Sequence, residues 1–379
     1  MQALVFDKSK TDWATSKGFE LVNIPEPTLT AGDGDKIILK VAYAGVCGTD
    51  RGIWNRQAFK DAILNSLDAQ IQTGGNPYRI IGHEFFGEIT QVGSKVKDLN
   101  VGDMVACESH VVCNQCYQCL HGQKNVCTNE KILGISVDGG FAEYAKVPAQ
   151  VAWKVDLNKI RPEVAVLHEP FGNAVHAASK VDLKGKTVAI FGLGPIASFL
   201  VLIARGLGAK TIIGVEPNDK AIEMGKKLGV DEVIKIAPGK DYHSDKSVIQ
   251  KIMQSTNGLG VDIAFEMAGF NNSVNNAIAS VRRGGEVILF GLKNGDFTFE
   301  DYNKLVMKGI TMHCVAGRQI WGTWEITKKL FEDKQNQVAE KLWSVLLDSG
   351  KGTILDIGSY SKEKFEQMLA QHPKFLIKF

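Results

Sequence analysis

The sequence predicts an α/β protein of two domains, one with a doubly wound parallel sheet and one that is mainly β. Three observations carry this prediction. The chain has 379 residues, enough for two domains at about 100–200 residues each. Its first part reads as short strands punctuated by glycine. From residue 171 onward, strands alternate with helices around a glycine turn, which is typical of βαβ units on a parallel sheet.

Composition and charge argue against several classes of protein. Apolar residues make up 44% of the chain and charged residues 23%, as in ordinary globular proteins. The net charge of +2 gives no field that would recruit nucleic acid or an anionic membrane. The N-terminus, MQALVFDKSK, lacks the pattern of a signal peptide, and apolar runs such as FLVLIA at 199–204 are too short to span a bilayer. We therefore expect a cytoplasmic protein.

The first part of the chain is rich in β-branched and aromatic residues. Four segments are expected to be strands: 3–6, 36–46, 85–93 and 103–112. One segment departs from this pattern, RQAFKDAILNSLDAQI at 56–71. It places Phe59, Ile63, Leu67 and Ile71 at every fourth position, which predicts an amphipathic helix.

The second part begins with a strand, a glycine turn, an apolar helix and a strand over 186–217, and the alternation continues through 261–269 and 284–292. Near residue 310 the pattern changes, with a strand expected in 309–317 and helix in 324–347. We expect a cofactor domain, 171–309, inserted into a catalytic domain made of 1–170 and 310–379.

Four of the seven cysteines lie in one short lobe, 107–128. Cys113, Cys116, Cys119 and Cys127 follow the pattern C-x2-C-x2-C-x7-C. In a reducing compartment such a cluster more often binds metal than forms disulfides, and a closed structural zinc site takes four thiolates. Two local disulfides, unrelated thiols and an iron–sulfur cluster are the alternatives. Cys107 and Cys314, outside this cluster, are expected to be buried thiols.

The sequence GLGPIA at 192–197 has the spacing of a dinucleotide-binding loop and follows a predicted strand. Gly192 permits the tight turn, Gly194 allows close approach of a pyrophosphate, and Ala197 permits close packing of helix on strand. Glu216 ends the next strand, where an acid accepts hydrogen bonds from the ribose 2′-hydroxyl and repels a 2′-phosphate, so NAD is favoured over NADP. Lys220 lies nearby and tempers this preference. Alternatively, Glu216 only caps the following helix.

A second metal site is suggested by residues from separate segments. Cys47 lies in GVCGTD, His83 and Glu84 lie in IIGHEFFG, and Glu169 lies in LHEPFGNAVH. A cysteine, a histidine and a carboxylate can bind zinc and leave one position open for substrate. From spacing alone, core residues remain an alternative.

Motifs in family order cover most of residues 40–217: GVCGTD, GHEFFGEI, the four-cysteine lobe, EPFGNAVHAA and GLGPIA. On these motifs the chain resembles the zinc-dependent medium-chain dehydrogenase/reductase family, and ESHVVC and EPFGNAVH resemble its threonine/polyol branch. The resemblance implies a GroES-like catalytic domain, a Rossmann cofactor domain and oxidation of a secondary alcohol by NAD. L-threonine, giving 2-amino-3-oxobutyrate, is the expected substrate, with a sugar or polyol as the alternative. A homotetramer is also expected only by resemblance.

The same resemblance assigns roles to single residues. It implies a catalytic zinc on Cys47, His83 and Glu84, with Glu169 as a fourth ligand or just outside the first shell. It also implies that Thr49 begins a proton relay. Further contacts to NAD are implied for Ile196, for the turn Phe290-Gly291-Leu292, and for Val315 and Ala316.

Two departures from the family pattern fall beside the expected substrate pocket. Gly52 stands where threonine dehydrogenases carry a relay histidine, and the 56–71 segment lengthens the chain between Cys47 and His83. Arg51 and Arg318 are candidate partners for a substrate carboxylate, with a surface ion pair as the alternative for each. A binding protein that keeps the fold without catalysis is a further reading, and the intact Cys47, Thr49, His83 and Glu84 set speaks against it.

Overall fold

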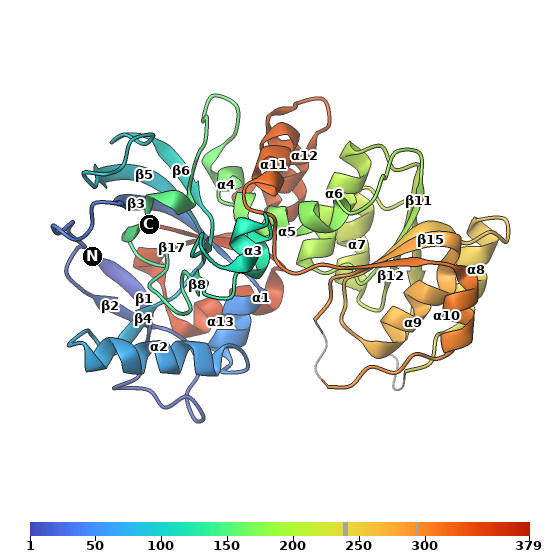
Figure 1. Cartoon of the computed structure of the whole chain (residues 1–379), viewed down its shortest axis with the longest axis horizontal. Helices are drawn as coiled ribbons and strands as arrows, with labels where there is room; N and C mark the ends of the chain where they lie inside the picture. Colours follow the sequence, from blue (N-terminus) through green and yellow to red (C-terminus); the bar gives the residue numbers. More distant parts are fainter. Residues whose placement is uncertain (238–241, 293–294) are drawn as a thin grey trace. The chain divides into compact units, whose positions relative to one another are not determined.

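The computed structural model describes residues 1–237, 242–292 and 295–379, and the chain divides into two compact units (Figure 1). Unit 1 comprises Met1–Glu169 and Leu342–Phe379, and unit 2 comprises Pro170–Lys341. Unit 2 is thus inserted into unit 1, which contains both ends of the chain.

One observed boundary differs from the predicted one. The sequence placed the return to the first domain near residue 310. In the structure β16 (Thr311–Cys314) pairs in parallel with β15 (Val281–Leu289), and α11 (Gly322–Glu332) also belongs to unit 2. The return therefore comes at Leu342, because residues 311–314 extend the parallel sheet of unit 2.

The main sheet of unit 1 has the strand order β10-β6-β5-β3-β18-β17, and β9 pairs with β3. Its strands are β3 (Lys36–Val46), β5 (Glu84–Val92), β6 (Met104–Cys107), β9 (Tyr144–Pro148), β10 (Ala152–Lys154), β17 (Ile354–Asp356) and β18 (Phe375–Lys378). β18 comes from the last residues of the chain and lies between β3 and β17. This pairing is what joins the two ends of the chain in one unit.

Two smaller sheets complete unit 1. They are β2-β1-β4, made of Glu20–Asn23, Gln2–Asp7 and Tyr78–Ile80, and β7-β8, made of His110–Val111 and Lys131–Ile132. The strand expected at 103–112 is therefore two strands, β6 and β7, separated by Glu108 and Ser109. The core contains a cluster of aromatic rings: Phe19, Trp54, Phe141, Phe365 and Phe375.

The helices that begin in unit 1 are short. They are α1 (Gly48–Trp54), α2 (Lys60–Gln72), α3 (Tyr117–Leu120), α4 (Pro162–Ala165), α5 (His168–Ala178, which continues into unit 2) and α13 (Lys362–Gln371). Single turns of other helical types occur at Lys124–Val126, Ala149–Val151, Leu342–Leu346, Asp348–Gly350 and Ile357–Ser359.

The expected amphipathic helix exists as α2, and it begins later than predicted. Arg56 and Phe59 have φ angles of 59° and 61°, a left-handed conformation that stops a right-handed helix from extending to residue 56. Ile63 and Leu67 are buried as expected, whereas Phe59 is 42% and Ile71 41% exposed. The apolar face of the helix is therefore shorter than the sequence pattern suggested.

Unit 2 contains a six-stranded parallel sheet with the order β13-β12-β11-β14-β15-β16. Its first four strands in the chain are β11 (Thr187–Phe191), β12 (Thr211–Glu216), β13 (Glu232–Lys235) and β14 (Val261–Glu266). In chain order this is 3-2-1-4-5-6, the order of a doubly wound dinucleotide-binding fold. The predicted fold class is confirmed.

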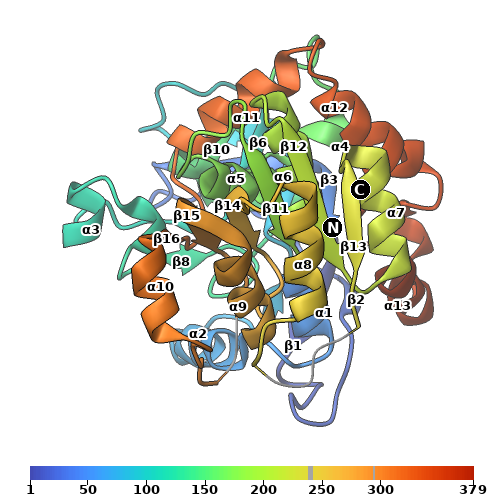
Figure 2. The same cartoon turned by 90° about the vertical axis from the view of Figure 1, so that its right-hand side faces the viewer.

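Helices cover both faces of this sheet (Figures 1 and 2). α6 (Pro195–Gly206) and α7 (Asp219–Leu228) pack together, and α8 (Lys246–Ser255) and α9 (Asn271–Ser280) pack together on the other face. The remaining helices of unit 2 are α10 (Tyr302–Lys308) and α12 (Val338–Lys341). Figure 2 shows α7 beside β12 and β13.

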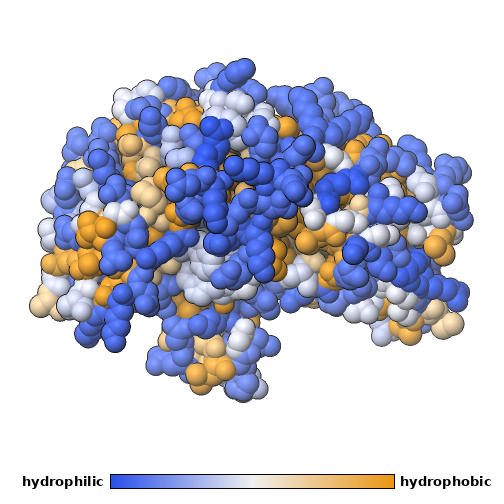
Figure 3. Space-filling model, turned by 90° about the horizontal axis from the view of Figure 1, so that it is seen from above, coloured by the Kyte–Doolittle hydropathy of each residue, from blue (hydrophilic) through white to orange (hydrophobic). Residues whose placement is uncertain are grey.

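The face drawn in Figure 3 is mostly hydrophilic, with apolar side chains in small separate patches. Among the described residues, no helix combines the length and the apolar character that crossing a bilayer would require.

Candidate functional site

Cys47, His83 and Glu84 come together in unit 1. Cys47 directly follows β3, and Glu84 begins β5, which pairs antiparallel with β3 so that Gly45 lies opposite Glu84. The Cys47 Sγ lies 3.0 Å from the His83 Nε2. One potential ligand atom from each of the three residues lies within 4.8 Å of the other two. The sheet register therefore brings together three donor residues that are separated by up to 37 positions in the sequence.

Asp50 organises this group. Its Oδ2 accepts a hydrogen bond from the Cys47 backbone N–H at 2.9 Å and caps α1. Its Oδ1 lies 3.5 Å from the His83 Nδ1. A carboxylate at Nδ1 favours the tautomer in which Nε2 is free to bind metal, and Nε2 is the atom that faces Cys47. Asp50 is completely buried, so its orientation is fixed.

The charges around His83 favour a cation at this position. Burial disfavours the imidazolium form, yet the charges of Cys47 and Asp50 outweigh burial and hold the pKa of His83 well above its usual value. A proton there takes the place that a metal ion would fill. A thiolate, an imidazole and a carboxylate are also the donor types of zinc sites. The residues present therefore fit a zinc ion.

Glu84 has a second partner, Lys374. The ammonium of Lys374 forms an ion pair with the Glu84 Oε2, and both side chains are at least 98% buried. A Cβ on Gly45 would lie 2.2 Å from this oxygen and 3.2 Å from the Lys374 Nζ, so the missing side chain makes room for the pair. Burial raises the pKa of Glu84, the ammonium of Lys374 opposes that shift, and the charge of Glu169 adds to it.

Glu169 lies in the first turn of α5 and is 3% exposed. It is not among the three residues whose ligand atoms cluster within 4.8 Å, although it lies close enough to raise the pKa of Glu84. This placement agrees with a position just outside the ligand group.

Thr49 lies on α1 and contacts Cys47 through its backbone. Its N–H donates to the Cys47 Sγ at 3.2 Å, which stabilises a thiolate. One turn further along α1, a Cβ on Gly52 would lie 2.7 Å from the Cβ of Ala58. Ala58 belongs to the loop that leads into α2, so the added segment fills the space beside Gly52.

The four lobe cysteines also converge. The Sγ atoms of Cys113 and Cys127 are 3.5 Å apart, and those of Cys116 and Cys127 are 3.8 Å apart. All four Sγ atoms lie within 4.8 Å of one another. Sulfurs around tetrahedral zinc lie about 3.8 Å apart, given Zn–S bonds of about 2.3 Å. No disulfide joins any of the seven cysteines in the structure, and the space between the four lobe sulfurs suits one small ion.

The lobe thiols differ in acidity. Backbone N–H donation from Cys119 lowers the pKa of Cys116 to about 5, whereas burial raises the pKa of Cys119 to about 12. Cys107 is buried, as expected. Cys314 is exposed, contrary to expectation, because β16 is the end strand of its sheet and Cys314 is its last residue.

The glycine loop of unit 2 connects β11 to α6. Gly192 has a φ of 88°, a left-handed value that favours glycine, and Gly194 is the residue that precedes α6. The free N–H groups at the start of a helix suit a phosphate. Glu216 accepts hydrogen bonds from the backbone of Leu193 at 2.7 Å and Asn218 at 2.9 Å. Glu216 therefore holds the loop as well as ending β12.

The other expected cofactor residues lie at the same edge of the sheet, since parallel strands end together. Ile196 and Ala197 are in the first turn of α6. Phe290, Gly291 and Leu292 follow β15, and Leu292 is 96% exposed. Val315 and Ala316 follow β16. The structure thus brings the expected cofactor residues to one edge of unit 2.

The two candidate arginines have different surroundings. Arg51 is exposed, and its guanidinium donates to the backbone carbonyl of Leu369. Arg318 is only 3% exposed, and its Nη1 lies 3.4 Å from the Asn173 Oδ1. A Cβ on Gly172 would lie 3.0 Å from the Arg318 Cδ. Arg318 is thus buried, whereas Arg51 is exposed.

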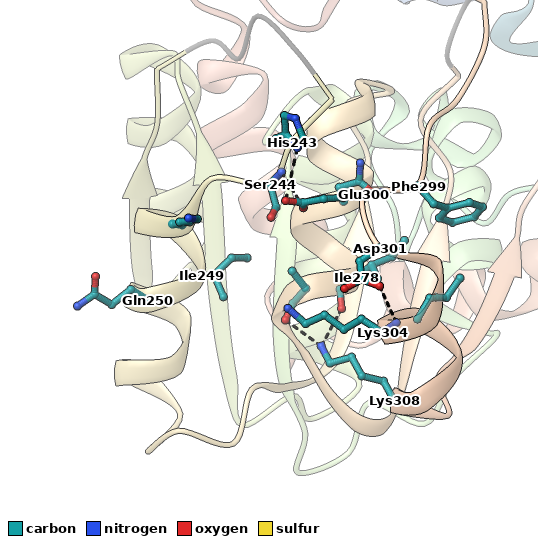
Figure 4. A pocket seen from close by; sticks show the side chains of 14 residues that line it. His243, Ser244, Ile249, Gln250, Ile278, Phe299, Glu300, Asp301, Lys304 and Lys308 are labelled. Carbon is teal, nitrogen blue, oxygen red and sulfur yellow. Dashed lines mark hydrogen bonds and ion pairs between the residues drawn. The ribbon is translucent and has the colours of Figure 1, made fainter.

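A separate hollow of about 630 Å³ lies among α8, α9 and α10 (Figure 4). No residue predicted to bind metal, cofactor or substrate lines it. Glu300 accepts from the Ser244 N–H at 3.0 Å. The ammonium of Lys308 donates to the carbonyls of Ile278 and Ala279 at 2.9 and 2.8 Å, and burial lowers its pKa to about 8. These polar groups form hydrogen bonds to the backbone near helix ends. We therefore assign them to the stability of the fold.

Sequence reasoning missed two residues that contact the group Cys47, His83 and Glu84. Asp50 stands three residues after Cys47, the spacing of a helix capping box, and that signal could have found it. Lys374 stands 290 residues after Glu84, and nothing in the local sequence around it indicates the pairing.

Comparisons with known proteins agree with this geometry. The family model described as "Alcohol dehydrogenase GroES-like domain" matches residues 33–157, and "Zinc-binding dehydrogenase" matches residues 195–333. An L-threonine 3-dehydrogenase of Pyrococcus horikoshii is 37% identical over 317 residues, covering 83% of this chain and 84% of the relative.

Solved structures share the fold. An alcohol dehydrogenase from Thermus sp. ATN1 has a TM-score of 0.80 at 22% identity, covering 100% of this chain and 99% of that one. A zinc-binding dehydrogenase from Sinorhizobium meliloti 1021, solved with NADP, has a TM-score of 0.77 at 22% identity, covering 100% of this chain and 99% of that one.

Proposed function

Since the chain belongs to the zinc-dependent medium-chain dehydrogenase/reductase family, and is therefore a dehydrogenase that uses zinc and a nicotinamide cofactor, we propose that it oxidises L-threonine with NAD. The reaction removes hydride from the carbon that bears the hydroxyl and gives 2-amino-3-oxobutyrate. The observation that carries the substrate is the 37% identity to an L-threonine 3-dehydrogenase over most of both chains. A sugar or polyol is the less favoured substrate.

We place the catalytic zinc on Cys47, His83 and Glu84, with Glu169 just outside. The three donors within 4.8 Å and the charge balance around His83 support this assignment. Bound zinc supplies a Lewis acid that strengthens the acidity of a hydroxyl group. Asp50 keeps the His83 Nε2 directed toward Cys47. In this way the chain presents its donors in a fixed arrangement.

We propose that the Thr49 hydroxyl accepts the proton of the alcohol and passes it to water. Thr49 stands two residues after Cys47 on α1. Gly52 offers no side chain to continue the path, and Ala58 fills the space beside it. A pH–rate profile for kcat is therefore expected to lack the transition of a relay imidazole near pH 6.5.

A second, structural zinc is proposed for the lobe, on Cys113, Cys116, Cys119 and Cys127. Their sulfur spacing supports one tetrahedral ion. Four thiolates leave no open position, so this zinc stabilises the lobe and takes no part in the reaction. The expected metal content is two zinc ions per chain.

NAD is preferred over NADP in this proposal. A 2′-phosphate would meet the carboxylate of Glu216, which is held in place by two backbone N–H groups. The relative from Sinorhizobium meliloti carries NADP, so the preference depends on residues of this chain. Binding of NAD and NADP, compared in the wild type and in Glu216→Ser, tests it. A wild type that favours NADP would contradict the assignment.

We also propose a cytoplasmic homo-oligomer, and a tetramer by resemblance. The clustered free thiols suit a reducing compartment. Within unit 2, β16 is the end strand of the sheet. The nearby helix α10 carries Tyr302, Val306 and Met307, which are 57–71% exposed. An end strand and an apolar helix face suit a symmetric contact between two copies. Light scattering of the wild type and of Met307→Lys tests this contact.

The deciding experiment is NADH formation by the zinc-loaded enzyme on L-threonine, D-glucose, sorbitol and a simple secondary alcohol. Selective turnover of L-threonine supports the proposal, and turnover of only a polyol or sugar contradicts the substrate assignment. Cys47→Ser is expected to abolish activity. Cys314→Ser, at an exposed thiol outside both proposed zinc sites, is the matched control and is expected to retain it.

A further inference from the structure

Two glycines of unit 2 stand where glycine is normally unfavourable. Gly214 lies inside the buried strand β12, and Gly225 lies inside α7, where it is buried. Glycine weakens the interior of strands and helices relative to alanine. Neither residue has a positive φ, so the backbone conformation does not require glycine. The reason must lie in the space around the two residues.

That space is filled by Leu193, the residue between the two glycines of the cofactor loop. A Cβ on Gly214 and a Cβ on Gly225 would each lie 2.9 Å from the Leu193 Cδ1. Val230 closes the hollow, with methyl groups 3.2 and 3.4 Å from the same two positions. Leu193 is 2% exposed, so its side chain sits in a hollow bounded by strand β12 and helix α7.

The backbone of Leu193 is held as well. Its N–H donates to the Glu216 Oε2 at 2.7 Å, and the preceding N–H, of Gly192, donates to the Val215 carbonyl at 2.8 Å. Side chain and backbone therefore fix the loop to β12 and α7. Because protein interiors are close-packed, a displacement of the leucine would be passed to the adjoining backbone.

We propose that Gly214 and Gly225 are positioning residues for the cofactor, because together they seat Leu193 and thereby set the placement of the loop that receives the pyrophosphate. The inference rests on the proposed binding of a nicotinamide dinucleotide. Neither glycine needs to touch the cofactor. Their role is to keep the backbone at Gly192 and Gly194 where a phosphate can approach it.

The test is the affinity for NAD, measured by calorimetry on the full-length zinc-loaded protein. Rotation of the Leu193 side chain can accommodate one added methyl group. The decisive variant is therefore Gly214→Ala/Gly225→Ala, which fills the hollow from both sides. Its Kd for NAD is expected to rise about tenfold or more, equivalent to about 1.4 kcal/mol. Because the change affects NAD binding, KM for NAD is expected to rise far more than kcat falls.

Three further variants give the test its controls. Leu193→Ala empties the hollow and is also expected to weaken NAD binding. Adding Gly225→Ala to Leu193→Ala should cause no further loss, because the atom that the methyl group would meet has gone. Gly322→Ala adds a methyl group at the first residue of α11, where the Gln319 Oε1 would lie 3.9 Å away, and should leave NAD affinity unchanged.

Two outcomes overturn the inference. One is a folded Gly214→Ala/Gly225→Ala protein that binds NAD as the wild type does. If that variant does not fold, Leu193→Ala decides alone, and wild-type affinity there overturns the inference. A wild type that binds neither NAD nor NADP contradicts the proposed function instead, so the two failures are distinguishable.

Discussion

A Cβ built on Gly52 would lie 2.7 Å from the Cβ of Ala58. Ala58 stands in the loop that enters α2, so the glycine and the added helical segment occupy one shared volume. The two departures from the family pattern noted in the sequence are therefore one structural feature. A larger side chain at position 52 cannot be accommodated while this loop keeps its course.

Gly52→Ala is expected to destabilise unit 1. Overpacking of a filled site typically costs about 1–3 kcal/mol, and chemical denaturation will measure the change in the free energy of unfolding. Ala58→Gly in the same chain should recover most of the loss, because it removes the atom that the new methyl group meets. A Gly52→Ala protein as stable as the wild type would show that the loop has another course.

Lys374→Met should destabilise the zinc-free protein much more than the zinc-loaded one. Removing one partner of a buried ion pair costs about 3–5 kcal/mol, because the other charge is left buried and uncompensated. Bound zinc would provide Glu84 with another cation. Thermal unfolding with and without zinc measures the difference between the two states.

Two controls accompany this variant. Lys374→Arg keeps the positive charge and should lie closer to the wild type. Lys362→Met breaks an ion pair with Glu20 whose side chains are 42% and 33% exposed, and such exposed pairs contribute only about 0–1 kcal/mol. An equal response of Lys374→Met with and without zinc would argue against a role for Glu84 at the metal.

In the zinc-free protein at neutral pH, iodoacetamide is expected to label Cys116 well before Cys119. Only the thiolate reacts, and the pKa of Cys116 is lowered to about 5 whereas that of Cys119 is raised to about 12. Mass spectrometry of peptides reads the order, and bound zinc should protect both residues. Faster labelling of Cys119 would contradict the structure of the lobe.

The same shift predicts how the stability of the zinc-free protein depends on pH. The pKa of Cys116 is about 5 in the folded protein, against an ordinary value of 9.0. Between pH 5 and pH 9 this thiol therefore binds more protons in the unfolded chain than in the folded protein. The contribution of Cys116 to the free energy of unfolding is fully present above pH 9 and is lost as the pH falls toward 5. Cys116→Ser should flatten the unfolding profile in this window, and an unchanged slope would contradict the prediction.

Arg318→Met is expected to raise KM for L-threonine about tenfold or more and to leave KM for a simple secondary alcohol nearly unchanged. The reason is that charge-assisted hydrogen bonds to a carboxylate are among the stronger ones. Arg51→Met is the matched comparison, since Arg51 already donates to a backbone carbonyl. Equal effects of Arg318→Met on both substrates would contradict a contact between Arg318 and the substrate carboxylate.

The sequence predicted the features that depend on local spacing. The glycine loop, the cysteine lobe and the alternation of strands and helices are patterns within a few tens of residues, and the structure contains each of them. Cys47, His83 and Glu84 were found because they sit in recognisable motifs. The strand limits at β3 were also predicted correctly, since its apolar run is long and continuous.

Features that depend on distant pairing were missed. Lys374 reaches Glu84 only because β18 pairs with β3, and no periodic pattern reports such a pairing. The predicted boundary near residue 310 differs from the observed one for the same reason, since β16 joins its sheet through β15. The late start of α2 follows from left-handed residues at 56 and 59, which no apolar spacing reveals.

The pairing of β18 with β3 has a consequence for synthesis on the ribosome. Glu84 is translated 290 residues before Lys374, and the strand next to Lys374, β18, follows it directly in the chain. Until Lys374 has been synthesised, the carboxylate of Glu84 lacks this partner, so the ion pair can stabilise unit 1 only after β18 has paired with β3.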